Sequence, residues 1–395
     1  MRKNTRFLFL IIGCLFFAAF SSFYSASWNR ISLYVVLPFS FVLCFIENGA
    51  SPRTNKYVHL LWALFAWVMV TVLYATRSDY ALRELRQIMG VFLVSFVFGV
   101  VAKKKGNVPW LYLVYFVLYL SVWNYARNNI LGEITFGEDR LNDDKLNANM
   151  LAYYTFFISF ASFILGEIFK KDWLRTTCKT LFFLSIPLSF LVAIYTASRQ
   201  VFVIQIPLIS VLLYYRYFRS TKGIYRLLFV IAVIAISAYA IPKAQSVYEN
   251  SFLRFRNEQT SIEGVRGQLL IDSFNVGMRH FFTGVGAGNY AYYSFDGHFS
   301  HNTFLELFAN TGIVGLVLFI VLLASYLKTQ FRRLRTTGDH MYFYFFWFGI
   351  VFVVACMFYV YYPKMWLMGF FILVASHSET YYKNSIIQRQ TGLIS

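Results

Sequence analysis

Charged residues are scarce in this chain. They make up 14% of its 395 residues, whereas hydrophobic residues make up 58%. Soluble globular domains carry about 25% charged and about 45–50% apolar residues, so this composition excludes an ordinary soluble domain. The apolar residues come in runs of roughly 17–22, the length that a helix needs to cross a bilayer. The sequence therefore predicts an all-α polytopic membrane protein, with residues 1–395 forming a single integral membrane domain.

Cysteine is also rare. The four cysteines, Cys14, Cys44, Cys178 and Cys356, show no CxxC or Cys/His spacing, which argues against a disulfide framework or a zinc site. The acidic loop at 127–149 contains an Asp-Asp pair but no calcium-loop spacing, so we interpret it as a solvated loop, either recognising sugar hydroxyls or without a role. No metal and no cofactor are expected.

What the chain has in abundance is apolar helix. Twelve segments are predicted to span the membrane, with the N- and C-termini cytoplasmic. These spans are 7–25, 31–46, 57–76, 88–102, 109–126, 148–169, 180–197, 200–215, 225–242, 303–327, 341–361 and 365–378.

The net charge of +18 is a topology signal. With this orientation, most lysines and arginines fall in cytoplasmic segments such as 103–105, 170–179, 216–226 and 328–335. Basic residues concentrate on the cytoplasmic side of membrane proteins. The basic excess is thereby explained, and nucleic acid is not expected as a partner.

The largest outward segment, residues 243–302, is inserted between the ninth and tenth spans. From 262 to 282 its sequence has a helical period, with Leu270, Phe274 and Phe281 on one side. This pattern predicts an amphipathic helix that lies on the membrane surface. Arg266 falls in the first turn of this helix, where it is either an ordinary polar-face residue or part of a site.

Other arginines are also predicted at the outer surface. Arg199 lies in a turn between two spans that is too short to be a real loop, and a charge there is costly unless it faces a cavity or a partner. Arg83 and Arg86 occupy the outward loop 76–87. Each arginine either extends to lipid headgroups or helps to bind an anionic lipid ligand.

Gly284, Gly286 and Gly288 lack the GxGxxG register of a dinucleotide loop. Their spacing indicates a backbone that bends sharply or approaches a ligand closely. We expect this cluster to be part of a substrate site.

His301 lies just before a predicted helix. Thr303 and Glu306 have the spacing of a capping box, which predicts a helix beginning at Thr303. The positive end of that helix disfavours the imidazolium form of a nearby histidine, and a neutral imidazole can act as a general base. The alternatives are that His301 caps or packs, or that His298 is the base instead.

These motifs together resemble the O-antigen ligase/O-antigen polymerase superfamily, which are bacterial membrane glycosyltransferases. The resemblance rests on Ser198-Arg199 at the start of a span, Arg266 followed by FTGVGAGN at 282–289, and HNTFLE at 301–306 leading to TGIVGL at 311–316. It covers roughly residues 195–321, and the remaining spans match only in number and hydropathy.

The resemblance implies a GT-C-like enzyme of the inner membrane that uses an undecaprenyl-diphosphate-linked glycan donor at the periplasmic face. It implies Arg199 and Arg266 at the diphosphate and His301 near the acceptor sugar, and we add Asn302, Gly286, Gly288, Arg83 and Arg86 as substrate contacts. Membrane lipids are further partners, and a flippase and a chain-length regulator are candidate partners.

Two activities fit this family. A polymerase joins the glycan to another lipid-linked repeat unit, and a ligase joins it to lipid A core oligosaccharide. The short segment between Gly288 and His301, and the sequence YYPK at 361–364, favour the polymerase. A flippase or transporter is the alternative outside the enzymes, but such proteins have internal repeats and midplane charges, which this sequence does not show.

Overall fold

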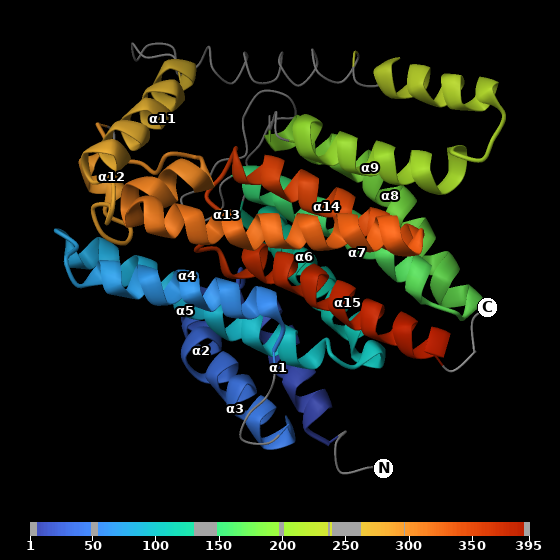
Figure 1. Cartoon of the computed structure of the whole chain (residues 1–395), viewed down its shortest axis with the longest axis horizontal. Helices are drawn as coiled ribbons and strands as arrows, with labels where there is room; N and C mark the ends of the chain where they lie inside the picture. Colours follow the sequence, from blue (N-terminus) through green and yellow to red (C-terminus); the bar gives the residue numbers. More distant parts are fainter. Residues whose placement is uncertain are drawn as a thin grey trace. The chain divides into compact units, whose positions relative to one another are not determined.

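The fold is known from a computed structural model, which describes residues 6–48, 54–129, 148–196, 201–235, 238, 262–295 and 297–390. All regular structure in these ranges is helical (Figure 1). The predicted all-α class is therefore confirmed for them. Most of the acidic loop and residues 243–261 of the outward segment fall outside the described residues.

The helices follow one another with short connections. Their bounds are α1 Arg6–Ser21, α2 Ala26–Ile31, η2 Ser32–Val36, α3 Leu37–Asn48, α4 Lys56–Val72, α5 Ser78–Val101, η3 Lys105–Asn107, α6 Val108–Asn129, α7 Ala148–Ile168, α8 Asp172–Thr196, η4 Val201–Gln205, α9 Ile206–Leu213, η5 Tyr214–Phe218, α11 Ile262–Arg279, α12 Tyr290–Tyr293, α13 Thr303–Thr337, α14 His340–Cys356 and α15 Met365–Gln390. A further apolar helix covers Gly223–Ala235.

Several of these helices have the length and apolar character of membrane spans. Those long enough to cross a bilayer are Ala26–Glu47, Ser78–Val101, Lys105–Tyr125 and Thr303–Thr337, and further apolar helices are shorter. Each predicted span overlaps a helix of the structure. The number of crossings and their direction stay predictions.

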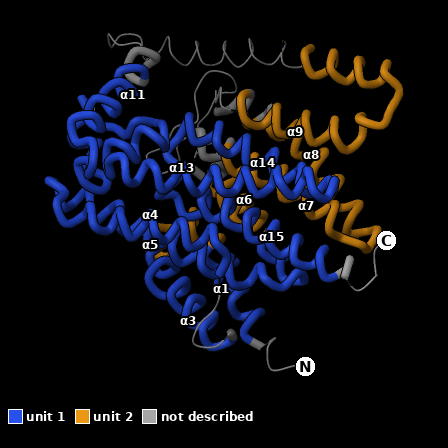
Figure 2. Tube along the Cα trace, in the orientation of Figure 1, with its two compact units in different colours: residues 1–18, 30–111, 260–395 blue, residues 19–29, 112–259 orange. Residues whose placement is uncertain are grey.

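The chain forms two compact units (Figure 2). Unit 1 comprises residues 1–18, 30–111 and 260–395, and unit 2 comprises residues 19–29 and 112–259. In unit 1, α13 packs against α4, α11 and α14, and α5 packs against α3, α4 and α15. In unit 2, α7 packs along α8, and η4 contacts both of these helices.

Helix α13 is bounded by local sequence signals. The side chain of Asn302 accepts hydrogen bonds from the backbone N–H groups of Phe304 and Leu305, at 2.9 and 3.1 Å, which satisfies donors that have no partner within the helix. Gly338 ends the helix in a left-handed conformation with φ 64°. The predicted helix start at Thr303 is confirmed, but the capping residue is Asn302 rather than Thr303.

Helix α11 confirms the predicted helix at 262–282 but not its buried face. The residues that pack inward are Leu269, Ser273 and Val276, which contribute to the contact with α13. Phe274 is 50% exposed and Phe281 is 38% exposed. The helix is apolar on two sides, because one side packs on α13 and the other is open to the surroundings.

Candidate functional site

The glycine cluster is a sharply bent segment that packs closely on other parts of unit 1. Gly284, Gly286 and Gly288 have φ values of 71°, 96° and 66°, which residues with a Cβ atom rarely adopt. A Cβ atom on Gly286 would lie 2.6 Å from the Cα of Ala75. The predicted bend is therefore present, and the close approach that the structure shows is to this chain's own backbone. Contact of Gly286 and Gly288 with a substrate stays a prediction.

The same segment lies against a break in α13. Gly312 has a non-helical conformation with φ 67° and ψ −167°. The carbonyl groups of Ala309 and Asn310 accept hydrogen bonds from Val285 N and Gly286 N at 2.9 and 3.0 Å. The indole of Trp67 donates to the Thr311 carbonyl at 2.8 Å. Carbonyl groups released by the break thus find partners outside the helix, as backbone at membrane depth requires.

The far end of the glycine segment is attached to the start of α5. The buried side chain of Asn289 accepts from Arg77 N at 2.7 Å and donates to Arg77 O at 3.2 Å. Tyr74 donates its hydroxyl to Thr283 O at 2.6 Å. On the left of Figure 1, the α4–α5 connection, α12 and the beginning of α13 lie together.

His301 immediately precedes α13 and has an unusual backbone conformation. Its φ is 57°, which makes it a non-glycine residue with positive φ among those that the structure describes. Its ring lies 4.3 Å from the Phe299 ring, centroid to centroid, and its side chain is half-buried. Such backbone strain persists only where the surroundings enforce it, and it gathers at functional sites.

The connection between α14 and α15 holds the segment around His301. Asn302 donates to Met357 O at 3.3 Å, and Thr303 donates to Tyr359 O at 2.6 Å. Tyr361 N donates to the Thr303 hydroxyl at 2.9 Å. Because the Asn302 amide serves these bonds and the helix cap, its predicted contact with substrate stays a prediction.

A buried polar network that the sequence analysis missed lies beneath this segment. The carboxylate of Glu306 accepts from Ser300 N at 2.7 Å and from Asn310 Nδ2 at 3.1 Å. Tyr362 hydrogen-bonds to Glu84 of α5, and burial is the main cause that raises the pKa of its phenol well above the usual value. The phenol therefore stays protonated and acts as a donor. The capping-box pattern drew attention to Glu306, but no sequence signal identifies its actual partner, Ser300.

The arginines predicted for the site have different standings. Arg83 and Arg86 are exposed on α5, rather than in a loop before it. Arg266 lies in the first turns of α11, but its side chain falls outside the described residues, as does Arg199 entirely. The convergence of Arg199, Arg266 and His301 therefore stays a prediction. His298 is exposed, and its carbonyl accepts from the Ser294 hydroxyl at 3.0 Å.

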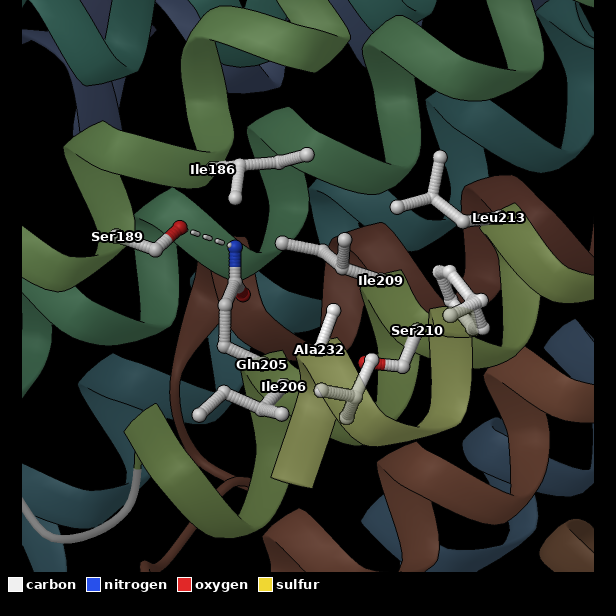
Figure 3. Close-up of a pocket in the computed structure, with 10 residues that line it drawn as sticks. Ile186, Ser189, Gln205, Ile206, Ile209, Ser210, Leu213 and Ala232 are labelled. Carbon is white, nitrogen blue, oxygen red and sulfur yellow. Dashed lines mark hydrogen bonds between the residues drawn. The ribbon is translucent and has the colours of Figure 1, made fainter. Parts of the chain in front are cut away.

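Unit 2 contains an apolar cavity of about 210 Å³ (Figure 3). It is lined by Ile186, Ser189, Gln205, Ile206, Ile209, Ser210, Leu213, Phe229, Ala232 and Val233. Gln205 stands at one side and donates from Nε2 to the hydroxyls of Ser159 and Ser189, at 2.6 and 2.7 Å. These bonds tie η4 to α7 and α8, and leave the rest of the cavity wall almost wholly apolar.

The helices and their composition define an α-helical membrane protein, and the bent, strained segments before α13 are its candidate site. Residues 182–320 match the family model described as O-antigen ligase. This segment, which contains Arg199, Arg266 and His301, therefore belongs to the O-antigen ligase/polymerase superfamily, and the resemblance predicted from the motifs is confirmed. The family implies a glycosyltransferase-like enzyme with lipid-linked sugar substrates. No curated protein matches the chain.

Proposed function

We propose that the protein is a periplasmic-face glycosyltransferase of surface polysaccharide assembly, such as O-antigen or capsule, in the bacterial inner membrane. It transfers a glycan from undecaprenyl diphosphate to the hydroxyl of an acceptor sugar. The observation that carries this proposal is the family match over residues 182–320, because all three predicted catalytic residues lie within it. The donor and the acceptor are part of the proposal.

His301 is the general base in this proposal. The acceptor hydroxyl attacks the anomeric carbon from the face opposite the diphosphate, its proton passes to the imidazole, and the bond from carbon to the diphosphate oxygen breaks. The product is an inverted glycosidic bond, and undecaprenyl diphosphate leaves. The position of His301 before a helix start supports a neutral imidazole, since the helix dipole disfavours a cation there.

Arg199 and Arg266 bind the diphosphate in this proposal. Guanidinium groups bind such oxygens in a bidentate manner. Negative charge on the diphosphate grows as the bond breaks, so these cations stabilise the transition state more than the bound donor. Arg83 and Arg86, exposed on α5, are proposed to support lipid-ligand binding.

The polyprenyl tail needs an apolar environment. The cavity of about 210 Å³ in unit 2 is large enough for part of such a chain, since a cavity of about 150 Å³ holds benzene. We propose that it holds the segment of the tail near the diphosphate. The exposed apolar face of α11, which includes Phe274 and Phe281, would contact lipid.

The acceptor separates two versions of this function. We favour a polymerase, because only twelve residues separate Gly288 from His301 in the sequence and because YYPK at 361–364 is typical of polymerases in our interpretation. The ligase remains the second candidate, since the matching family model is described as O-antigen ligase.

The test supplies purified full-length protein with an undecaprenyl-diphosphate-linked repeat unit, with and without lipid A core oligosaccharide. A ladder of longer lipid-linked glycans without core indicates the polymerase. Transfer to core alone indicates the ligase. Movement of the lipid-linked unit across vesicles without any new glycosidic bond would contradict the proposal and favour a flippase.

A further inference from the structure

Glu306 is connected to the residue before His301. One carboxylate oxygen accepts a hydrogen bond from Ser300 N at 2.7 Å, and the other accepts from Asn310 Nδ2 at 3.1 Å. The Glu306 side chain is 5% exposed and Ser300 is fully buried. A buried carboxylate is costly unless hydrogen bonds to it are complete, so this arrangement strongly constrains the backbone at Ser300.

Asn310, one turn further along α13, extends the constraint to the glycine segment. Its side-chain oxygen accepts from Tyr290 N at 2.7 Å, and its backbone carbonyl accepts from Gly286 N at 3.0 Å. The segment from 284 to 302 is therefore held near both ends by the first turns of α13. Glu306 holds the end that carries His301.

The conformation of His301 requires such a restraint. A left-handed backbone is unfavourable for a residue with a Cβ atom and is kept only where neighbours determine it. On one side, Ser300 is fixed by Glu306. On the other, Asn302 caps α13, and Asn302 N donates to the Ser300 hydroxyl at 3.3 Å.

The negative charge of Glu306 matters, beyond its size. A carboxylate can accept from Ser300 N and from Asn310 Nδ2 at the same time, and such charge-assisted bonds are stronger than neutral ones. A glutamine would have to turn its own NH₂ group toward one of these two donors. The Ser300 or the Asn310 bond would then be lost, and the restraint on His301 would weaken.

We propose that Glu306 is a positioning residue that acts on glycosyl transfer through His301. It fixes the backbone at Ser300 and thereby sets where the imidazole stands relative to the acceptor hydroxyl. This inference rests on the proposed function only for its effect on transfer. The restraint that Glu306 places on His301 is a property of the chain itself and is measured separately.

The test compares wild type with Glu306→Gln in the full chain. Small displacements of a catalytic group cost up to about 100-fold in rate, so we expect turnover to fall by about 10–100-fold, with the KM for the lipid-linked repeat unit nearly unchanged. The second readout is modification of His301 by diethyl pyrocarbonate, followed by mass spectrometry. Its rate should change at least about threefold, while the rate at His340 stays the same.

Glu47→Gln is the matched control. Glu47 is also a mostly buried glutamate of unit 1, with a side chain 5% exposed beside Lys104. Its substitution should leave both readouts unchanged. If Glu306→Gln does not yield folded protein, Glu306→Asp replaces it, because it keeps the charge but shortens the reach to Ser300, and the same direction of change is expected.

Two results would overturn the inference. One is an unchanged His301 modification rate, even if turnover falls, since Glu306 would then not act through His301. The other is wild-type turnover in Glu306→Gln alongside a loss of turnover in His301→Ala. If wild type itself transfers no glycan, the proposed function fails, and the modification rate alone decides whether Glu306 positions His301.

Discussion

At the scale of single residues, Gly286 and Gly297 separate two reasons why a fold needs glycine at a given position. Both have positive φ, 96° and 69°, but only Gly286 is packed, with Ala75 in the place of a Cβ atom. Gly286→Ala should lower the free energy of unfolding by about 3 kcal/mol or more, because strain and overpacking add. The measurement is a denaturation midpoint in detergent.

Gly297→Ala is the control for strain alone. No atom lies within 4 Å of the place that its Cβ atom would take, so the cost should be only about 1–2 kcal/mol. Equal destabilisation by both substitutions would show that the contact with Ala75 contributes nothing.

The sequence predicted part of the residue-scale site. His301 stood out because a histidine before a capped apolar helix has few ordinary explanations, and its strained backbone supports attention to it. Asn310 and Tyr362 gave no such signal, because a polar residue inside an apolar helix or turn reveals its role only through partners distant in sequence. Ser300 N, 2.7 Å from Glu306, is such a partner.

At the scale of elements, local signals located the helices well. Helix α13 begins where the pattern predicted, because capping depends on neighbouring residues. The packing side of α11 was predicted wrongly, because that helix is apolar on both sides and only α13 decides which side is buried. The break at Gly312 was equally hidden, since the bonds that stabilise it come from the 281–286 segment and Trp67.

The unit 2 cavity gives an element-scale prediction. Ser210→Phe places a ring in the cavity between α8, α9 and the 223–235 helix. If the cavity holds the polyprenyl tail, this substitution should raise the KM for the lipid-linked donor about tenfold, with a smaller effect on kcat, because it removes binding that is uniform along the reaction. Initial rates against donor concentration provide the measurement.

Val203→Phe is the companion variant. Val203 precedes the cavity on the same helical stretch and is 43% exposed, so its substitution should leave the KM unchanged. A KM for Ser210→Phe equal to that of Val203→Phe would remove the cavity from the donor site.

At the scale of the whole molecule, the distribution of basic residues predicts that the glycine and histidine segments face the periplasm. Gly106 and Gly297 both have open space around them, so a cysteine at either is accessible without repacking. In a background without the four native cysteines, Gly297→Cys should react with a membrane-impermeant maleimide in spheroplasts. Gly106→Cys, beside the Lys103–Lys105 cluster, should react only after the membrane is permeabilised.

The reverse labelling pattern would invert the predicted topology. His301 would then face the cytoplasm, and a periplasmic transfer reaction would be ruled out.

The central claim is that His301 accepts the proton of the acceptor hydroxyl. The most direct measurement is the rate of a single round of transfer from bound lipid-linked donor, in wild type and in His301→Ala with matched folding and donor binding. The account predicts a loss of at least about 100-fold, the scale of general-base catalysis. Transfer by His301→Ala at the wild-type rate would contradict it.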